Sequence, residues 1–472
     1  MAPNKIIIDT DPGVDDVLAM LLAFSARPEE LEILMLSITF GNVDVQNCLR
    51  NIVTLFHYIE KERAWRRSQG KPEGFEALNV RKPIVAVGAT EPLAEQMMVA
   101  DFFHGIDGLG GIHESHPHLS PTETWKSLFE PPPESMSSEE ASVLQKAKDE
   151  HSLFEPSLNY APDEMLRVLK ENDPDTITIV AIGPLTNLAI AAAKDPETFL
   201  RVKEVVVMGG AVDVPGNPPD LQHIYSPTTL SVPIPNFHLT KQPDTPLRRQ
   251  LNIRNQMTPG AEFNTYADSV ASARVFALTS PNPRTTMPPT LSTHPKSALP
   301  DYPTSLSKQL KLRLFPLDIT TPHLLPKQLF NAHSEKLEAS PLAQWAGAFL
   351  ASTFQKIWSM RPDQDIEGVG LELHDPLTIW YALSPSDAKW VFKEDEDVRV
   401  ETSGQWTRGA CIVDRRGKGM SMGEGDVESE VVGDAGGWLD SRRGNRISRC
   451  VGTPGEEKFA GVLLERVFGA VL

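Results

Sequence analysis

The sequence predicts an α/β fold in which helices flank a mostly parallel, open central sheet. Short apolar runs rich in β-branched residues alternate with longer helix-like stretches, which is the pattern of consecutive βαβ units. The apolar runs end in turns that carry Gly, Asp or Asn, and open α/β sheets bind ligands at such strand ends. The chain has 472 residues and no internal repeat, so we expect one domain over residues 1–472, decorated by insertions.

The first predicted strand, residues 6–8, leads into a turn that is rich in carboxylates. These acids are Asp9, Asp11, Asp15 and Asp16, and Pro12 and Gly13 stand among them. Carboxylates this close repel one another and lose hydration when buried, so they require a cation or hydroxyl donors between them. An apolar helix over residues 17–24 follows, and its first turn favours negative charge.

The remaining strands and helices follow the same alternation. We expect strands at residues 31–39, 83–87, 177–182, 202–208 and 312–317. The last of these is interrupted by Pro316. We expect helices at residues 46–60, 161–171, 188–193, 269–278, 342–358, 373–383 and 459–467. Short β-like stretches cover residues 398–400 and 410–413.

Several segments lack periodicity and are rich in Pro, Ser, Gly or charged residues, which is typical of insertions. They cover residues 62–80, 112–160, 218–254, 280–308 and 417–444. Residues 103–111 hold four glycines but lack the Gly-Lys-Ser/Thr of a phosphate-binding loop. We expect a mobile loop there, and a candidate lid.

The composition of the chain excludes several classes of protein and several kinds of partner. Hydrophobic residues make up 40% and charged residues 23%, as in soluble globular proteins. No apolar run approaches the length of a membrane span. Since the first predicted strand starts close to Met1, we expect no signal peptide. The net charge of −18 argues against nucleic acid and anionic membranes as partners. Three widely spaced cysteines favour a reducing compartment, and we expect a cytoplasmic protein.

Several motifs, in this order along the chain, resemble the inosine-uridine preferring nucleoside hydrolase family. They are residues 9–16, 41–42, 104–110, 183–187, 208–210, 261–264, 374–377 and 414–416. The resemblance implies hydrolysis of the N-glycosidic bond of purine or pyrimidine ribonucleosides, uridine and inosine foremost, to free base and ribose. It also implies a homodimer or homotetramer and a role in nucleoside salvage.

The resemblance further implies a Ca²⁺ ion at the base of the pocket, and calcium binds carboxylate and carbonyl oxygens. The implied ligands are the carboxylates of Asp11, Asp16 and Asp375 and the backbone carbonyl of Ile182. Asp11 would also be the general base that removes a proton from the attacking water, whose pKa the ion lowers. Asp9 is expected to orient the turn.

The same resemblance assigns residues to the substrate. Asp15, Asn42 and Asp375 would bind the ribose hydroxyls, and Glu262 and Asn264 would bind the 5′-hydroxyl and ribose. Cleavage builds positive charge on the ribosyl ring, which nearby carboxylates stabilise. The leaving base needs a proton, and His374 is the expected donor because histidine titrates near neutrality.

Some assignments stay open at this stage. His104 is either a loop cap or a contact that closes over the substrate. The family usually places Gly-Asn just before the segment that here starts at Thr258, so either Asn217 or Gln256 fills the ribose-contacting position, and we favour Asn217.

Two other functions compete: a non-catalytic ribose- or calcium-binding protein, and a haloacid-dehalogenase-like phosphatase. Gly13 stands where such phosphatases need Thr or Val.

Overall fold

The computed structural model describes residues 2–94, 97–121, 123–129, 142, 153–217, 257–288, 299–361, 365–416, 434, 436–440 and 442–469. Within these residues the core of the protein is a nine-stranded sheet of order β10-β13-β7-β6-β5-β1-β2-β3-β4. All neighbouring strands are parallel except the pair β10–β13. The predicted fold class is therefore confirmed.

The strands of the large sheet are short and mostly apolar. They are β1 Asn4–Thr10, β2 Leu31–Ile38, β3 Ile84–Val87, β4 Glu155–Pro156, β5 Ile177–Ala181, β6 Glu204–Met208, β7 Leu312–Phe315, β10 Val391–Glu396 and β13 Ile447–Gly452. Two small antiparallel pairs lie apart from it. They join β8 Leu324–Pro326 to β9 Gly370–Glu372, and β11 Arg399–Val400 to β12 Cys411–Ile412.

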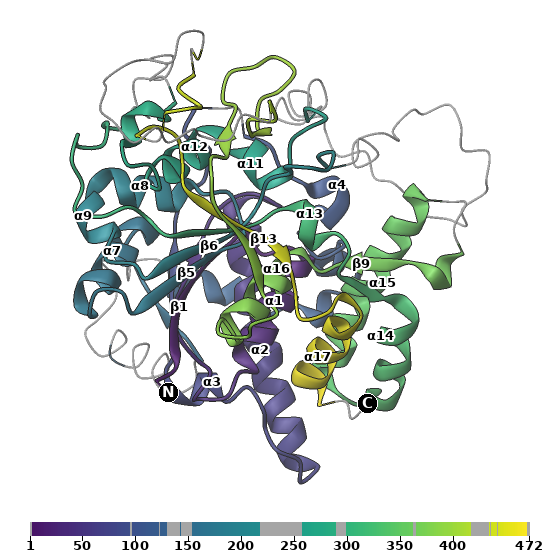
Figure 1. The fold of residues 1–472 in the computed structure, drawn as a ribbon. Coiled ribbons are helices and arrows are strands. Elements are labelled where there is room, and N and C mark those ends of the chain that lie inside the picture. The colour runs from purple at the N-terminus through teal and green to yellow at the C-terminus, as the bar shows by residue number, and fades with distance from the viewer. Residues whose placement is uncertain are drawn as a thin grey trace, which may run out of the picture.

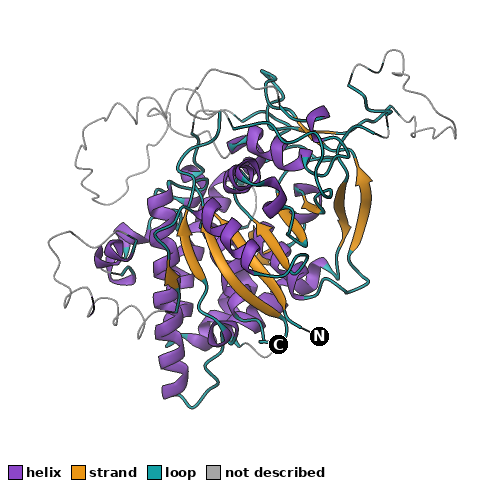
Figure 2. Cartoon of the chain, turned by 90° about the vertical axis from the view of Figure 1, so that its left-hand side faces the viewer, coloured by secondary structure: helices purple, strands orange, loops and turns teal. Residues whose placement is uncertain are grey.

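Helices cover both faces of the sheet (Figures 1 and 2). The longer helices are α1 Val14–Phe24, α2 Val45–Ser68, α7 Ala161–Glu171, α8 Thr186–Lys194, α12 Ser269–Ala277, α14 Lys327–Ser334, α15 Pro341–Met360, α16 His374–Leu383 and α17 Glu456–Phe468. The shorter helices are α3 Ala77–Val80, α4 Asp101–His104, α5 Ile112–Ser115, α9 Pro196–Phe199, α11 Phe263–Ala267 and α13 Leu317–Thr320. Among the described residues, none of the helices combines the length and hydrophobicity needed to cross a membrane.

The sheet separates two apolar cores, and β1 contributes to both because side chains alternate along a strand. Ile6 and Ile8 pack into the core that includes α1, α2, α15 and α17. Ile7 packs into the core on the other face, with α7, α8 and α12. This two-sided burial explains the uninterrupted apolar run at residues 6–8.

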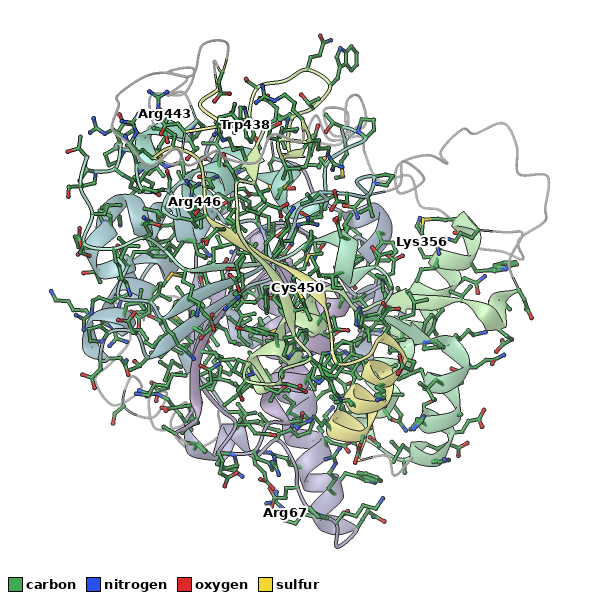
Figure 3. The ribbon with its side chains drawn as sticks, in the orientation of Figure 1. Arg67, Lys356, Trp438, Arg443, Arg446 and Cys450 are labelled. Atoms are coloured by element: carbon green, nitrogen blue, oxygen red, sulfur yellow. The ribbon has the colours of Figure 1, made fainter. Side chains whose placement is uncertain are left out.

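Residues 62–80, expected to be a loop-like insertion, are helical in part. Helix α2 continues to Ser68 and α3 occupies the end of the segment, so Arg67 marks the tip of a long helix that extends away from the sheet (Figure 3). Glu62 is buried, pairs with Arg66 at 2.7 Å and accepts a hydrogen bond from Ser340 at 2.7 Å. These contacts with the start of α15 stabilise the last turns of α2. The charged residues of these turns look like a loop when only the sequence is considered.

The other predicted insertions are described only in part. Within 112–160, α5 and two short 3₁₀ helices are ordered, and β4 lies at the sheet edge. Within 280–308, Tyr302 is buried, and the carbonyl of Pro300 accepts a hydrogen bond from Arg274 of α12. The segment 218–254 lies outside the described residues, as do residues 417–433, 435 and 441 of the last insertion.

Candidate active site

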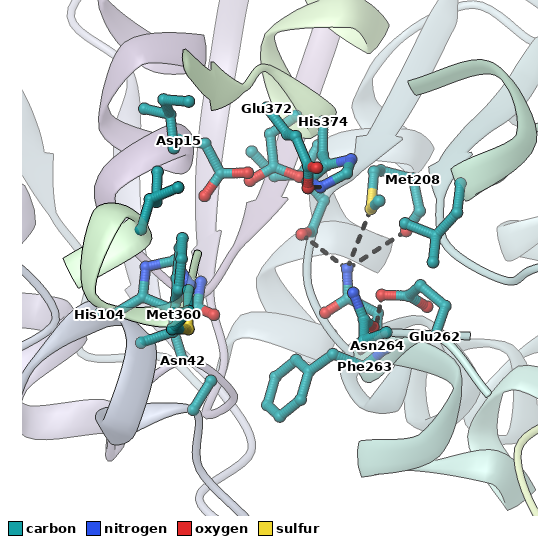
Figure 4. A pocket seen from close by; sticks show the side chains of 18 of the residues that line it. Asp15, Asn42, His104, Met208, Glu262, Phe263, Asn264, Met360, Glu372 and His374 are labelled. Carbon is teal, nitrogen blue, oxygen red and sulfur yellow. Dashed lines mark hydrogen bonds and ion pairs between the residues drawn. The ribbon is translucent and has the colours of Figure 1, made fainter. Parts of the chain in front are cut away.

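A pocket opens at the carboxyl ends of the central strands β1, β2, β5 and β6, where polar turns were predicted (Figure 4). Its polar lining residues include Asp15, Asn42, Asn217, Glu262, Asn264, His374 and Asp375. The lining also holds apolar side chains, among them Phe103, Leu317, Ile357, Met360 and Leu371, and the ion pair of Arg361 and Glu372. The structure thus gathers residues from distant parts of the chain at one edge of the sheet.

Asp11 sits at the base of this arrangement and is fully buried. Two glycines make room for its carboxylate: a Cβ on Gly41 would lie 2.0 Å from Oδ2, and one on Gly183 would lie 2.5 Å from Oδ1. Both distances are shorter than any non-bonded contact, so these turns can take this geometry only because positions 41 and 183 are glycine. Gly41 and Gly183 therefore leave the space that the Asp11 carboxylate occupies.

The two oxygens of Asp11 differ in their partners. Oδ2 accepts a hydrogen bond from the backbone N–H of Asn42 at 2.7 Å. Oδ1 is buried and has no hydrogen-bond partner within the described part of the chain. Burial, followed by the charge of Asp16, raises the pKa of Asp11 well above its ordinary value. An orphaned oxygen on a buried acid is the environment that a bound cation would complete.

Three further carboxylates converge beside Asp11. Oxygens of Asp15, Asp16 and Asp375 lie within 4.8 Å of one another. The first two begin α1 and the third begins α16, and these helices pack against each other. Burial raises the pKa of all three, that of Asp15 to about 6, and the charge of Asp11 contributes to the rise at Asp375. The donor set is made of hard oxygen ligands, so it fits a divalent cation such as Ca²⁺.

Asp16 is already held in place by the turn. Its Oδ1 accepts a hydrogen bond from Thr10 at 2.6 Å, and its Oδ2 accepts bonds from the backbone of Gly13 at 3.0 Å and from the side chain of Asn42 at 2.8 Å. Asp9 lies beneath the turn, where Oδ2 accepts bonds from Ser37 and Asn187. Burial raises the pKa of Asp9 to about 7.

Ile182 and Asn264 meet on the opposite side of the pocket floor. The side-chain amide of Asn264 donates to the carbonyls of Ile182 at 3.0 Å and Met208 at 3.3 Å (Figure 4). A carbonyl oxygen has two lone pairs, so the Ile182 carbonyl keeps one for a further partner. Sequence reasoning did not foresee this bond.

Glu262 begins α11 and is held by backbone donors. Its carboxylate accepts hydrogen bonds from Asn264 at 2.6 Å, Thr265 at 3.0 Å and Gly210 at 2.8 Å. Burial raises the pKa of Glu262 above its ordinary value in spite of these bonds. The Gly209-Gly210 turn after β6 therefore fixes a carboxylate on the pocket wall.

Asn217 lies in the pocket lining, and its side-chain oxygen accepts a hydrogen bond from the backbone of Phe263 at 2.7 Å. The close approach of Gly216 to Ala261 brings it there, since a Cβ on Gly216 would lie 2.1 Å from the carbonyl oxygen of Ala261. Gln256, the alternative for this position, lies outside the described residues.

His374 opens α16 and is held through both ring nitrogens. Nδ1 lies 2.8 Å from Oγ1 of Thr320, and Nε2 lies 3.1 Å from Oε2 of Glu372. Burial alone lowers the pKa of His374, but the hydrogen bond and charge of Glu372, with the charges of Asp15 and Glu262, raise it above its ordinary value. The acidic neighbours of His374 therefore favour the protonated form of its ring.

Residues 105–111, the glycine-rich segment after α4, pack against α2. This packing does not support the mobile lid that the sequence led us to expect. Asp107 accepts backbone hydrogen bonds from Leu109, Gly111 and His113, and Asn51 of α2 donates to the carbonyl of Asp107 at 2.8 Å. His104 is buried at its start, and Nδ1 accepts a hydrogen bond from the backbone of Val14 at 3.3 Å. Burial lowers the pKa of His104 to about 3, so the ring is neutral and its proton is on Nε2.

Sequence reasoning missed three residues of the site: Thr320, Arg361 and Glu372. Thr320 and Glu372 hold His374, and Arg361 forms an ion pair with Glu372 at 3.6 Å. None belongs to the motifs discussed above. The one available signal is that Glu372 is a charged residue within the apolar stretch 369–373.

Comparisons with known proteins show which family the chain belongs to. The family described as "Inosine-uridine preferring nucleoside hydrolase" matches residues 6–436. Uridine nucleosidase 1 of Arabidopsis thaliana is 36% identical over 215 residues, which cover 45% of this chain and 47% of that protein, so the alignment spans about half of this relative. The pyrimidine-specific ribonucleoside hydrolase RihA of Klebsiella pneumoniae is 26% identical over 87% of this chain and 88% of its own length.

Solved structures share the fold over nearly the whole chain. A plant nucleoside hydrolase superposes with a TM-score of 0.58 at 22% identity, covering 98% of this chain and 99% of that chain. A purine-preferring ribonucleoside hydrolase from Gardnerella vaginalis has a TM-score of 0.58 at 19% identity, with 98% of both chains covered. The chain therefore belongs to the inosine-uridine preferring nucleoside hydrolase family, whose enzymes act on N-glycosyl bonds.

Proposed function

We propose that this protein hydrolyses the N-glycosidic bond of ribonucleosides to free base and ribose. The observation that carries the proposal is that the buried carboxylates of Asp15 and Asp375, which cluster with that of Asp16, line the same pocket as His374. The carboxylates suit the positive charge that develops on the ribosyl ring. The histidine suits the negative charge that develops on the leaving base.

The reaction adds one water molecule across the bond. The C1′–N bond breaks and its electron pair goes to the base, which takes a proton from His374. The water oxygen bonds to C1′ and one water proton passes to Asp11. Release of ribose and base, followed by return of that proton through solvent, restores both residues.

The remaining polar residues would bind the sugar. Asp15, Asn42 and Asp375 would accept or donate to the 2′- and 3′-hydroxyls, while Glu262, Asn264 and Asn217 would hold the 5′-hydroxyl side. A 2′-deoxyribonucleoside lacks one of these contacts and should be a poor substrate. His104 would donate through Nε2 to the substrate, because Nδ1 is already engaged.

A calcium ion would be held by Asp11, Asp16, Asp375 and the carbonyl of Ile182, with Asp15 close enough to contribute. Such an ion, when bound, supplies a Lewis acid that lowers the pKa of a water and orients ribose hydroxyls. Support comes from the orphaned oxygen of Asp11 and the raised pKa values around it. We further propose that the enzyme is a cytoplasmic homodimer or homotetramer that serves nucleoside salvage.

The test is release of free base from uridine, inosine, cytidine and adenosine, with and without EGTA, alongside Asp11→Ala. We expect turnover of at least one nucleoside that EGTA and Asp11→Ala each abolish, and the panel then identifies the preferred base. Ribose that raises the melting temperature without any base release would favour the non-catalytic binding protein instead. Activity that survives EGTA would overturn the calcium proposal alone.

A further inference from the structure

Asn51 lies within α2 and is fully buried, but it is not among the residues that line the pocket. Its side-chain amide donates one hydrogen bond to the carbonyl of Pro12 at 2.9 Å and another to the carbonyl of Asp107 at 2.8 Å. Pro12 belongs to the acid turn, residues 11–16, directly after β1, whereas Asp107 belongs to the glycine-rich segment, residues 105–111. One side chain of α2 therefore connects these two segments.

His113 fixes the orientation of the Asn51 amide. The two carbonyls use both hydrogens of the amide nitrogen, so the amide oxygen Oδ1 is left to accept. Nε2 of His113 lies 2.8 Å from this oxygen and therefore carries a hydrogen, while Nδ1 accepts from the hydroxyl of Ser120 at 2.6 Å. Burial lowers the pKa of His113 to about 4, in agreement with a neutral ring. The reverse orientation of the amide would place its oxygen against two carbonyl oxygens, so this arrangement is the stable one.

The Pro12 carbonyl belongs to the same peptide unit as the N–H of Gly13. In a trans peptide these two groups point in opposite directions, and the planar unit turns as a whole. The N–H of Gly13 donates to Oδ2 of Asp16 at 3.0 Å. Asn51 thus holds one side of this peptide, and the other side holds a carboxylate of the acid cluster, which consists of Asp11, Asp15, Asp16 and Asp375. Rotation of the peptide would break both hydrogen bonds.

The glycine-rich segment approaches the acid turn closely at this point. A Cβ on Gly108 would lie 2.8 Å from Nδ2 of Asn51 and 3.1 Å from the carbonyl oxygen of Pro12. At the start of the segment, Nδ1 of His104 accepts from the backbone N–H of Val14 at 3.3 Å. Two backbone groups of the acid turn are therefore bound by side chains from outside the turn.

We propose that Asn51 is a positioning residue for the acid cluster: through the Pro12–Gly13 peptide it holds Asp16 in the place where the cluster binds a cation. This inference rests on the proposed function for the identity of the ion, calcium. Asn51 exchanges no proton and touches neither the ion nor the substrate. Because Asp107 accepts the second hydrogen bond of the same amide, the packing of residues 105–111 contributes to the order of the acid turn.

The experiment measures the calcium affinity of the full chain, stripped of metal with EGTA and then dialysed, by isothermal titration calorimetry well below the melting temperature. Asn51→Leu replaces the amide with a side chain of similar size that donates no hydrogen bond. We expect the Kd for calcium to rise about 10- to 100-fold, the usual effect of losing a residue that orients a metal ligand. The calcium concentration that gives half-maximal uridine cleavage should rise by the same factor. A loss of folded protein would lower the amplitude of both signals but not shift these two midpoints.

A second pair of variants keeps Asn51 and changes the residue that orients it. His113→Gln retains a donor near the position of Nε2, whereas His113→Leu has none. We expect the Kd for calcium to rise about 3- to 10-fold in His113→Leu, the size of one hydrogen bond, and to change less than about twofold in His113→Gln.

The matched control is Thr54→Val, which removes another buried polar group of α2. The hydroxyl of Thr54 donates to the carbonyl of Arg50 within the helix at 2.7 Å. Because this bond does not involve the acid turn, the control should leave the Kd for calcium within about twofold of wild type, whatever its effect on stability.

Unchanged calcium affinity in Asn51→Leu and in His113→Leu would overturn the positioning role, even if both variants melt at lower temperatures. If Asn51→Leu does not fold, the His113 pair decides the question. Wild-type protein that binds calcium but releases no base from any nucleoside would overturn the proposed function, and the calcium affinities of the variants would still decide the role of Asn51. The two failures are therefore distinguishable.

Discussion

Asn42 joins the two acids of the first turn: its backbone N–H donates to Oδ2 of Asp11 at 2.7 Å, and its side-chain amide donates to Oδ2 of Asp16 at 2.8 Å. The residue lies in the turn that follows β2, whereas both acids follow β1, and these strands are parallel neighbours. One asparagine therefore sets the separation of two carboxylates that would otherwise repel. The backbone contact of Asn42 is therefore separable by mutation from its side-chain contacts.

Replacing Asn42 with alanine keeps the backbone bond to the Asp11 carboxylate. It removes the amide bonds to the Asp16 carboxylate and, at 3.1 Å, to the carbonyl oxygen of Asp11. We expect turnover to fall about 100-fold, because Asp16 loses its position and the ribose loses a contact. Leaving a buried carboxylate without one of its donors should also destabilise the protein by about 1–3 kcal/mol. Base-release kinetics and thermal unfolding measure the two effects.

The matched control is Asn47→Ala, which removes an exposed amide bond to Asp44 in the first turn of α2. It should change stability by less than about 0.5 kcal/mol and leave turnover unchanged. Full activity in Asn42→Ala would mean that the amide neither positions Asp16 nor binds substrate.

Glycine at 183 is predicted to be required for activity. An alanine there would place Cβ 2.5 Å from Oδ1 of Asp11, so the carboxylate must rotate or the turn must shift. We expect Gly183→Ala to reduce kcat about 100-fold or more, since a shift of one ångström in a catalytic group has effects of this size. Steady-state kinetics on the preferred nucleoside provide the measurement.

Gly347→Ala is the control for this substitution. Gly347 lies inside α15, and an added Cβ there would meet no atom within 4 Å. Alanine favours the helix, so this variant should be fully active and more stable by about 0.5–1 kcal/mol. A Gly183→Ala protein with normal kcat would show that the Asp11 carboxylate tolerates movement.

The sequence predicted the centre of the fold better than its margins. Strands β1, β2, β3, β5, β6 and β7 were expected because each is an apolar run buried on two faces. The edge strand β10 was missed because its side chains are mostly charged and exposed, as is typical of sheet edges. The length of α2 was missed because tertiary contacts of Glu62, rather than periodicity, stabilise its last turns.

The residues of the site also fall into those that the sequence predicts and those that it does not. Residues in motifs, such as Asp15 and His374, could be named in advance, and the structure brings both into one pocket, although their roles stay predictions. Glu372 and Arg361 could not, because their pairing depends on how the end of α15 packs beside β9. No local pattern encodes that contact.

The ion pair between Glu30 and Arg466 predicts a pH dependence of stability at a site remote from the pocket. Both oxygens of Glu30 accept from Arg466 of α17, at 2.8 and 2.9 Å. Hydrogen bonds from Arg466 and, to a smaller extent, from the side chain and backbone of Arg27 lower the pKa of Glu30 from 4.5 to about 2, against the effect of burial. The folded-state pKa is the lower one, so the pair stabilises the folded protein fully above pH 4.5 and loses this effect as the pH falls towards 2.

Glu30→Gln should therefore lower the melting temperature at pH 7, and the difference from the wild type should shrink below pH 4.5. The expected cost at pH 7 is about 1–2 kcal/mol, reduced from the full shift because the pair is partly solvated. Thermal unfolding from pH 7 to pH 3 measures it. Glu29→Gln, at the exposed neighbouring position, should show no pH-dependent difference. A constant gap between Glu30→Gln and wild type at every pH would contradict the electrostatic explanation.

His104 allows a test that separates anchoring from substrate binding. Nδ1 accepts from the backbone of Val14, and Nε2 is left to donate. Asparagine offers an acceptor near the position of Nδ1, and glutamine offers a donor near that of Nε2.

If His104 contacts the substrate, the free energy of unfolding of His104→Asn should stay within about 1 kcal/mol of wild type. Its kcat/KM should nevertheless fall about 10-fold, the size of one hydrogen bond. His104→Gln should show the reverse: a lower melting temperature and better retained kcat/KM. Normal kinetics in His104→Asn would instead assign His104 to capping the α1 turn alone.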